Sequence, residues 1–159
     1  MTLAETLLTK AKAKGIMIAT AESCTGGMVS AAITDIPGSS AILDRGFVTY
    51  TNDAKIDMLG VKGQTLADHG AVSTQVAREM ALGAVAHSNA AMAVSITGIA
   101  GPGGSEFKPE GRVCFGVVIG QYVKVETIEF GAIGRQNVRE AAKNHALQLL
   151  IDTIDIHCD

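Results

Sequence analysis

A candidate nucleophile, Ser23, stands in the segment AESCTGG at positions 21–27, between a short apolar run and a helical stretch. Backbone N–H groups at the start of a helix have no intrahelical partner, so they could stabilise a negative oxygen formed beside this serine. A second interpretation is that Ser23 or Thr25 only caps the helix. Cys24 is a rival nucleophile, because a thiol near a helix N-terminus can have a lowered pKa.

A candidate base lies in the segment VTYTNDAK at positions 48–55. Asn52 is a suitable cap for a short helix through Leu59, which would put Lys55 in the first turn, where the helix dipole disfavours its positive charge. A lysine activates a serine only if its pKa falls by about 3 units, and burial must supply most of that shift. The hypothesis therefore requires a desolvated Lys55. The alternatives are a solvated lysine and a Tyr50 that is only a strand aromatic with its hydroxyl in water.

A glycine-rich segment, TGIAGPGGS at positions 97–105, follows another predicted strand. Its glycines allow a close approach to a ligand and can turn several N–H groups towards an anion. The spacing is not that of a Walker loop. The segment therefore indicates either a phosphate or carboxylate site or a flexible connection. Lys108, Arg135 and Arg139 could add positive charge, or each could be a solvated side chain.

Metal and disulfide chemistry have little support in the sequence. The histidines lack the short spacings of metal sites, and the acids are scattered; the histidines are His69, His87, His145 and His157. The three cysteines are odd in number and irregularly spaced, and Cys114 falls in a predicted strand that would be core. We therefore expect no metal, no cofactor and no disulfide framework.

The chemistry-bearing loops are positioned by alternating helices and strands. Helical spacing and end signals predict helices from Leu3 to Gly15, from Met28 to Ile33, from Asn52 to Leu59, after the cap Ser73, and from Arg135 onward. Apolar runs predict strands at 16–19, 47–50, 91–96, 113–119 and 122–130, the last two joined by a type II′ turn at Gly120-Gln121. We expect an α/β fold: a three-layer α/β/α sandwich with a mixed, partly antiparallel sheet in a single domain.

The bulk composition limits the classes of partner. A chain of 159 residues fits one ordinary domain, and a net charge of -3 without a basic stripe argues against direct nucleic-acid binding. The amino terminus does not look like a secretory signal, and no apolar run approaches the length of a membrane span. We expect a cytoplasmic protein without membrane contact.

Four segments together resemble one known family: AESCTGG at 21–27, VTYTNDAK at 48–55, GAVS at 70–73 and SITGIAGP at 95–102. They are similar to the carboxy-terminal domain family of the competence/damage-inducible protein CinA, also known as the nicotinamide mononucleotide (NMN) deamidase family. The resemblance extends over essentially the full length, which implies one such domain over residues 1–159 and self-association into a homo-oligomer.

The resemblance also implies a reaction and a set of residues. The reaction is conversion of NMN to nicotinic acid mononucleotide and ammonia, with Ser23 as nucleophile, Lys55 as base and the Tyr50 hydroxyl orienting or relaying the proton. Arg135 or Arg139 is the implied phosphate partner, because a planar guanidinium can bind two oxygens. The implied substrate-binding residues are Glu22, Cys24, Thr25, Gly26, Gly27, Asn52, Thr97, Gly98, Ala100, Gly101, Gly103, Gly104, Arg135 and Arg139.

The sequence departs from the family pattern at two places. Residues 105–112 carry additional charges that could alter the rim of the pocket, and Gly134 stands where an aspartate is usual before Arg135. Longer relatives have an amino-terminal domain with pyrophosphatase activity, which is not transferred to this chain. Two other functions stay open: a non-catalytic nucleotide-binding or competence-accessory module, and hydrolysis of an amide in another pyridine or purine ligand.

Overall fold

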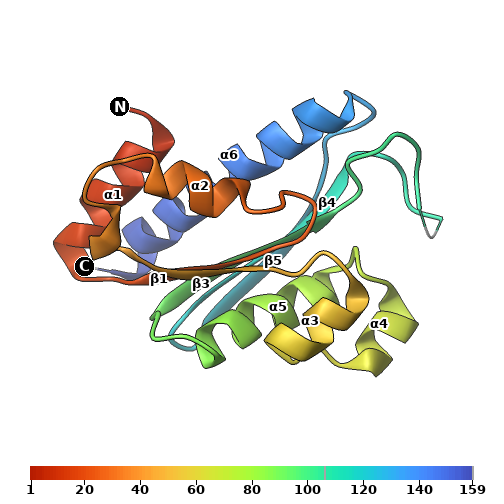
Figure 1. Cartoon of the computed structure of the whole chain (residues 1–159), viewed down its shortest axis with the longest axis horizontal. Helices are drawn as coiled ribbons and strands as arrows, with labels where there is room; N and C mark the ends of the chain where they lie inside the picture. Colours follow the sequence, from red (N-terminus) through yellow and green to blue (C-terminus); the bar gives the residue numbers. More distant parts are fainter. Residues whose placement is uncertain (106, 159) are drawn as a thin grey trace.

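A five-stranded mixed sheet lies between two layers of helices in the computed structural model of the chain, which describes residues 1–105 and 107–158 (Figure 1). The strands follow the order β2-β1-β3-β4-β5 across the sheet. Strand β1 pairs in parallel with β2 and β3, whereas the β3–β4 and β4–β5 pairs are antiparallel. The strands are β1 (Ile18–Glu22), β2 (Leu43–Val48), β3 (Met92–Gly98), β4 (Arg112–Ile119) and β5 (Tyr122–Glu129).

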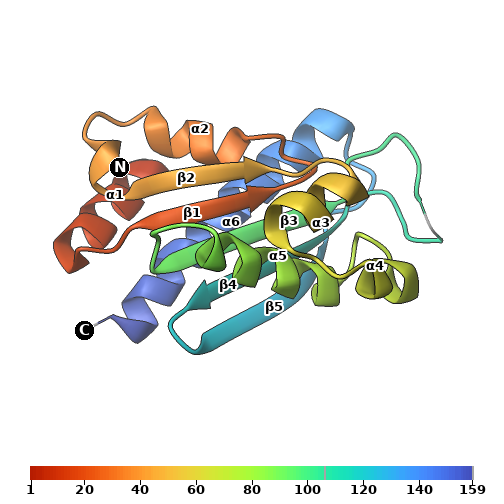
Figure 2. The same cartoon turned by 60° about the horizontal axis from the view of Figure 1, so that its bottom comes forward.

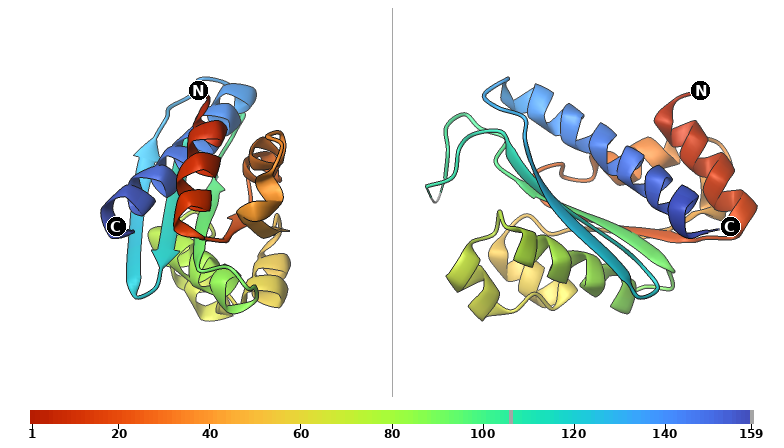
Figure 3. Two further views of the ribbon diagram at one scale, coloured as in Figure 1. Left: turned by 90° about the vertical axis from the view of Figure 1, so that its left-hand side faces the viewer. Right: turned by 180° about the vertical axis from the view of Figure 1, so that it is seen from behind.

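Each face of the sheet is covered by its own group of helices (Figures 1 and 3). One layer consists of α1 (Leu3–Lys14), α2 (Met28–Thr34) and α6 (Arg135–His157). The opposite layer consists of α3 (Asn52–Leu59), α4 (Gly63–His69) and α5 (Thr74–Ala86). A short 3₁₀ turn, η1 (Ser39–Ala41), leads into β2. The expected three-layer α/β/α sandwich with a partly antiparallel sheet is therefore confirmed.

The two helical layers bury separate apolar clusters against the sheet. Helix α6 packs on β3 and β4 through buried Val138, Ala142, Ala146 and Leu150, the face that helical spacing predicted. On the other side, α5 packs on β3 and β4, and its Met80 is fully buried. Side chains of β1 alternate between the clusters, so consecutive residues of this strand face opposite layers.

Several predicted boundaries shift where tertiary pairing overrides local pattern. The first strand covers Ile18–Glu22 rather than 16–19, because β1 continues as long as both neighbouring strands pair with it. The second covers Leu43–Val48 rather than 47–50, since polar Asp44 and Arg45 hid its start. Helix α4 was not predicted, because it is short and begins at a glycine. Gly15 ends α1 as predicted, with φ at 65°.

The topology gathers the candidate loops at one edge of the sheet. In a parallel sheet, the loops after the carboxyl ends of the strands form the usual ligand crevice. Strands β1, β2 and β3 run in the same direction, and they are followed by Ser23, Tyr50 and the glycine-rich loop. Figure 2 shows these strand ends beside α3.

Candidate active site

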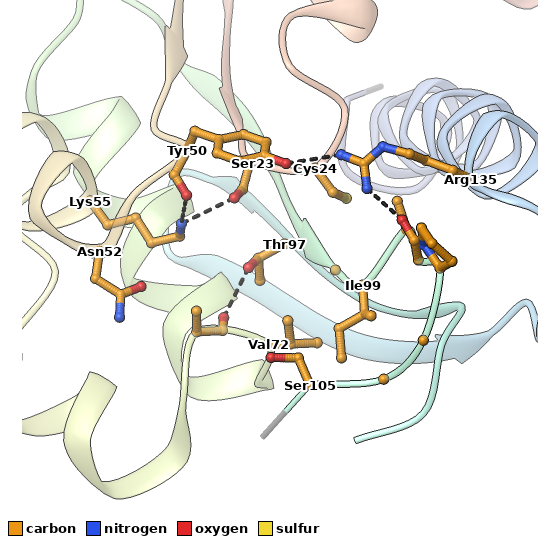
Figure 4. Close-up of a pocket in the computed structure, with 17 residues that line it drawn as sticks. Ser23, Cys24, Tyr50, Asn52, Lys55, Val72, Thr97, Ile99, Ser105 and Arg135 are labelled. Atoms are coloured by element: carbon orange, nitrogen blue, oxygen red, sulfur yellow. Dashed lines mark hydrogen bonds between the residues drawn. The ribbon is translucent and has the colours of Figure 1, made fainter. Parts of the chain in front are cut away.

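A cavity of about 310 Å³ opens at the carboxyl ends of the parallel strands (Figure 4). Its volume lies at the lower end of the range for small-molecule sites. Of the predicted site residues, those that line it are Ser23, Cys24, Tyr50, Asn52, Lys55, Thr97, Gly98, Ala100, Gly101, Gly103, Gly104 and Arg135.

Ser23 lies directly beyond β1, in a turn that many hydrogen bonds hold. The Ser23 N–H donates to the Ile96 carbonyl at 3.0 Å, and the Ser23 carbonyl accepts the Gly26 N–H at 3.0 Å. The side chain is 8% exposed and does not cap α2, so the capping interpretation is wrong for this residue. Ser23 lines the cavity.

Lys55 Nζ lies 3.0 Å from Ser23 Oγ, and the lysine is only 1% exposed. The same nitrogen donates to the Thr49 carbonyl at 2.9 Å and to the Tyr50 carbonyl at 3.2 Å. Burial lowers the pKa of Lys55 to about 8. A neutral amine has two N–H bonds and one lone pair; the two carbonyls match the N–H bonds, which leaves the lone pair facing Ser23. The desolvation that the sequence argument required is therefore present.

The cap of α3 is Thr51 and not Asn52, which corrects the prediction. Thr51 Oγ1 accepts the Ala54 N–H at 3.0 Å, and Lys55 N–H donates to the Thr51 carbonyl at 3.1 Å. Threonine supplies the same kind of side-chain oxygen as asparagine, so local pattern does not separate the two. The shift of one residue frees the Asn52 side chain, which lines the cavity.

Cys24 is a poor rival to Ser23 in this setting. It is 5% exposed, and burial raises the pKa of its thiol to about 11, although a backbone hydrogen bond and Arg139 act in the opposite direction. The thiolate is the reactive form of cysteine, so this side chain is unreactive near neutral pH. The lowered pKa considered from the sequence is not found, because desolvation outweighs the favourable charges.

Tyr50 contacts the Ser23–Lys55 pair, the dyad, through its backbone rather than through its hydroxyl. Its side chain is 58% exposed, and the phenolic oxygen accepts a hydrogen bond from Arg135 Nη2 at 3.0 Å. Within the described residues, this hydroxyl has no hydrogen bond to Ser23 or Lys55. The carbonyl of Tyr50 instead helps to hold Lys55 Nζ.

Arg135 joins two walls of the cavity. Its Nη1 donates to the Gly101 carbonyl at 2.6 Å, while Nη2 reaches Tyr50 (Figure 4). Arg135 and Lys55 are the charged side chains among the described residues that line the cavity, and no carboxylate lines it there. The cavity therefore favours an anionic ligand although the whole chain is acidic.

The glycine-rich loop forms the outer wall and is tied to its surroundings at several points. Thr97 Oγ1 donates to the Ala71 carbonyl at 2.9 Å, and the Gly103 N–H donates to the Glu110 carboxylate. Lys108 Nζ donates to the carbonyls of His69 and Val72 at 2.6 Å each. Lys108 thus fastens the loop to the segment before α5 and does not line the cavity.

Five predicted binding residues lie outside the cavity: Glu22, Thr25, Gly26, Gly27 and Arg139. For Glu22 the reason is the alternation of side chains at the end of β1, which turns Glu22 towards α2 while Ser23 faces Lys55. Arg139 donates to the Cys24 and Thr25 carbonyls instead. The Glu22 carboxylate accepts hydrogen bonds from the Thr25 hydroxyl, from the N–H groups of Val29 and Ser30, and from the Ser30 hydroxyl. It therefore supports the turn rather than a ligand.

Sequence reasoning missed five lining residues: Ala71, Val72, Ile99, Pro102 and Ser105. All five lie in residues 70–73 or 97–105, but four of the side chains are apolar, and no pattern around Ser105 marked its hydroxyl as a ligand group. In the described part of the chain, no cluster of three or more metal-ligating side chains occurs, and no helix is long and apolar enough to span a membrane.

Comparison with known proteins supplies the family. Residues 1–154 match the family described as the CinA C-terminal domain. The chain belongs to this family. It is 51% identical over 151 residues to the nicotinamide-nucleotide amidohydrolase PncC of Escherichia coli strain K12, which covers 94% of this chain and 92% of that protein.

Other relatives are longer or are known as structures. The chain is 49% identical to a CinA-like protein of Chloroherpeton thalassium but spans only 35% of its length. The crystal structure of a competence/damage inducible protein from Agrobacterium tumefaciens is 50% identical, with a TM-score of 0.92 over 96% of this chain and 93% of that one. A CinA superfamily protein from Klebsiella pneumoniae gives a TM-score of 0.93 at 32% identity. The fold is thus shared with solved members of the family.

Proposed function

We propose that this protein is an amidohydrolase that converts NMN to nicotinic acid mononucleotide and ammonia. The observation that carries the proposal is the 3.0 Å approach of buried Lys55 Nζ to Ser23 Oγ at the wall of a cavity. The name of the Escherichia coli relative supports the choice of substrate. Ser23 is the nucleophile and Lys55 the base.

The first half of the reaction forms an acyl-enzyme. Neutral Lys55 takes the proton of Ser23 as Oγ attacks the carboxamide carbon, which produces a tetrahedral oxyanion. The C–N bond then breaks, and the lysine ammonium gives its proton to the departing nitrogen, so that ammonia leaves. Nicotinate mononucleotide remains bound to Ser23 as an ester.

The second half repeats the proton transfers with water. Neutral Lys55 accepts a proton from water as it attacks the ester carbonyl, and the tetrahedral intermediate expels Ser23 Oγ. The lysine proton returns to the serine, and the free acid departs. The released acid loses its remaining proton to ammonia or solvent. One water is therefore consumed, the products are the carboxylate and ammonium, and atoms and charges balance.

The phosphate of the substrate is held at the other end of the cavity. Both Arg135 and the glycine-rich loop line this wall. The N–H groups of Ala100, Gly101 and Gly104 in the loop have no hydrogen-bond acceptor among the described residues. A guanidinium and backbone N–H groups are suitable ligands for phosphate oxygens. The Tyr50 hydroxyl orients Arg135, and the Tyr50 carbonyl orients Lys55. In the proposed Ser-Lys-Tyr mechanism, the hydroxyl of Tyr50 therefore helps to position the substrate.

The proposal covers the setting of the enzyme as well. Residues 1–159 act as one CinA C-terminal-like domain, in the cytoplasm, as a homo-oligomer. The net charge of -3 favours a small nucleotide over nucleic acid as the direct partner.

The test is ammonia release from NMN by purified protein, with nicotinic acid mononucleotide identified as the second product. Wild type should turn over, and Ser23→Ala should not. Saturable NMN binding without product would favour a non-catalytic nucleotide-binding module. Inactivation by Cys24→Ala, with activity kept in Ser23→Ala, would mean that the nucleophile is misassigned.

A further inference from the structure

Two arginines one helical turn apart on α6 point to different targets. Arg135 lines the cavity, whereas Arg139 lies half-buried against the loop that carries the nucleophile. Arg139 Nε donates to the Cys24 carbonyl at 3.0 Å, and its Nη2 lies 3.3 Å from the Thr25 carbonyl. Arg139 is therefore committed to the backbone of the loop and not to the ligand cavity.

The carbonyl groups of Ser23, Cys24 and Thr25 each have a donor. The Ser23 carbonyl accepts the Gly26 N–H, and the Thr25 carbonyl accepts the Met28 N–H in addition to Arg139. The Cys24 carbonyl has Arg139 as its donor. Without the guanidinium, the Cys24–Thr25 peptide would have no partner on its carbonyl side among the described residues, and this peptide plane could rotate.

Three N–H groups of the same loop, those of Cys24, Thr25 and Gly27, donate to no other residue that the structure describes. Cys24 and Thr25 are the buried residues of this set. Buried backbone donors without a partner are rare and costly, and both residues are almost fully buried. In a trans peptide the N–H points opposite to the carbonyl, so by holding the Cys24 carbonyl, Arg139 fixes the Thr25 N–H on the side away from α6.

We propose that Arg139 is a positioning residue for catalysis. It orients the Cys24–Thr25 peptide so that the free N–H groups of the loop meet the oxyanion that forms when Ser23 attacks. Preoriented donors need no reorganisation during the reaction. The strength of an oxyanion site therefore depends on the groups that hold its backbone N–H donors in place, and here that group is Arg139. The inference rests on the proposed chemistry at Ser23 and adds a residue that does not touch the substrate.

The matched pair of variants is Arg139→Met and Arg135→Met. For Arg139→Met we expect kcat to fall by about 10²-fold, the scale for loss of one oxyanion donor, with KM for NMN changed by less than about 3-fold. Arg135→Met should instead raise KM and affect kcat less. Arg139→Lys should recover part of kcat, because an ammonium can still donate to one of the two carbonyls.

A second readout does not depend on the substrate. Hydrogen exchange of the Gly26 and Met28 amides should accelerate at least about tenfold in Arg139→Met, because their acceptors lie in the loop that Arg139 holds. Exchange in Arg135→Met should match wild type. Thermal unfolding of both variants reports whether the fold is kept, and Arg139→Lys serves both readouts if Arg139→Met does not fold.

The outcomes separate the two proposals. Unchanged exchange in Arg139→Met, or a rise in KM with unchanged kcat, would overturn the positioning role. An inactive wild type would contradict the proposed function, and the exchange result would still decide whether Arg139 orders the loop. Faster exchange with a fall in kcat at constant KM supports the inference.

Discussion

The nucleophile loop and the glycine-rich loop follow neighbouring strands of one sheet, yet they are built in opposite ways. In residues 22–27 the side chains of Glu22, Ser23, Cys24 and Thr25 are all buried. The Glu22 carboxylate ties this loop to α2, and Arg139 of α6 donates to its backbone. In the glycine-rich loop, residues 102–105 are exposed. The proposed reacting atoms are thus held by a packed interior, while the proposed ligand-recognition surface lies on a wall open to solvent.

The contrast has a physical reason. A lysine can serve as a base only where water is excluded, and a misplaced nucleophile costs rate steeply, so the dyad needs burial and many bonds. A phosphate needs N–H groups and a cation that it can reach from solvent, which a glycine-rich loop provides. Changes in the first loop should therefore affect turnover and folding, and changes in the second should affect affinity.

The largest effect is expected at the dyad. Ser23→Ala and Lys55→Met should each lower kcat for ammonia release by at least about 10³-fold, because either change removes proton transfer to the lysine. Lys55→Met keeps the apolar length of the side chain and removes a buried amine, but it also removes the donor of the Thr49 and Tyr50 carbonyls. These effects oppose each other, so the thermal stability should change little. Circular dichroism with the ammonia assay checks both points; an active Lys55→Met variant would contradict the assignment of the base.

The next largest effect is on the free energy of unfolding, and it compares the carboxylates that hold the two loops. Glu22→Ala leaves the buried donors of Val29 and Ser30 unpaired and should lower the free energy of unfolding by about 2–4 kcal/mol. Glu110→Ala, the matched change behind the glycine-rich loop, should cost less than about 1 kcal/mol, because its partner Gly103 is exposed and can bond to water. Urea unfolding measures both; equal losses would remove the contrast between the loops.

A third effect is confined to affinity. Arg135→Met should raise KM for NMN by about 10-fold or more, since a hydrogen bond to a charged group contributes about 1.5–3 kcal/mol. The same variant should leave KM for the unphosphorylated nucleoside nearly unchanged. Steady-state kinetics with both substrates tests this, and an equal rise for both would mean that Arg135 does not recognise the phosphate.

The smallest effect is expected from charge alone at the outer wall. Glu110→Gln keeps an acceptor for the Gly103 N–H but removes a negative charge beside Gly101, so KM for NMN should fall by about 2-fold to 5-fold. Added salt should weaken this difference. A higher KM in the variant would show that the carboxylate helps the ligand rather than opposing it.

The sequence predicted the fold well because helical periodicity and glycine helix ends coincide with observed elements. The catalytic roles of Ser23 and Lys55 stay a prediction, and the structure places Lys55 Nζ 3.0 Å from Ser23 Oγ. The requirement for a desolvated Lys55 followed from its pKa alone, and the lysine is indeed 1% exposed. The predicted cap of α3, Asn52, was wrong by one residue, since Thr51 and Asn52 offer equivalent side-chain oxygens. Local pattern has no means of choosing between them.

Side-chain direction accounts for the rest of what the sequence did not predict. Alternation along β1 would have directed Glu22 away from Ser23, but this required the strand to extend to residue 22. Arg135 and Arg139 bind different loops because of the way α6 crosses the sheet, and local sequence does not determine this crossing. The Tyr50 hydroxyl likewise takes its partner from a helix 85 residues later.

The proposed mechanism requires that buried Lys55 is neutral when it accepts the Ser23 proton, and the pH dependence of kcat/KM for NMN tests this most directly. Burial lowers the pKa of Lys55 to about 8; below that pH the amine is protonated and cannot accept the serine proton, and above it the base is present. The rate should therefore rise with pH through an apparent pKa near 8 and then level off. A rate independent of pH between about pH 6 and pH 10, or one that falls across this range, would contradict the role of Lys55 as the base.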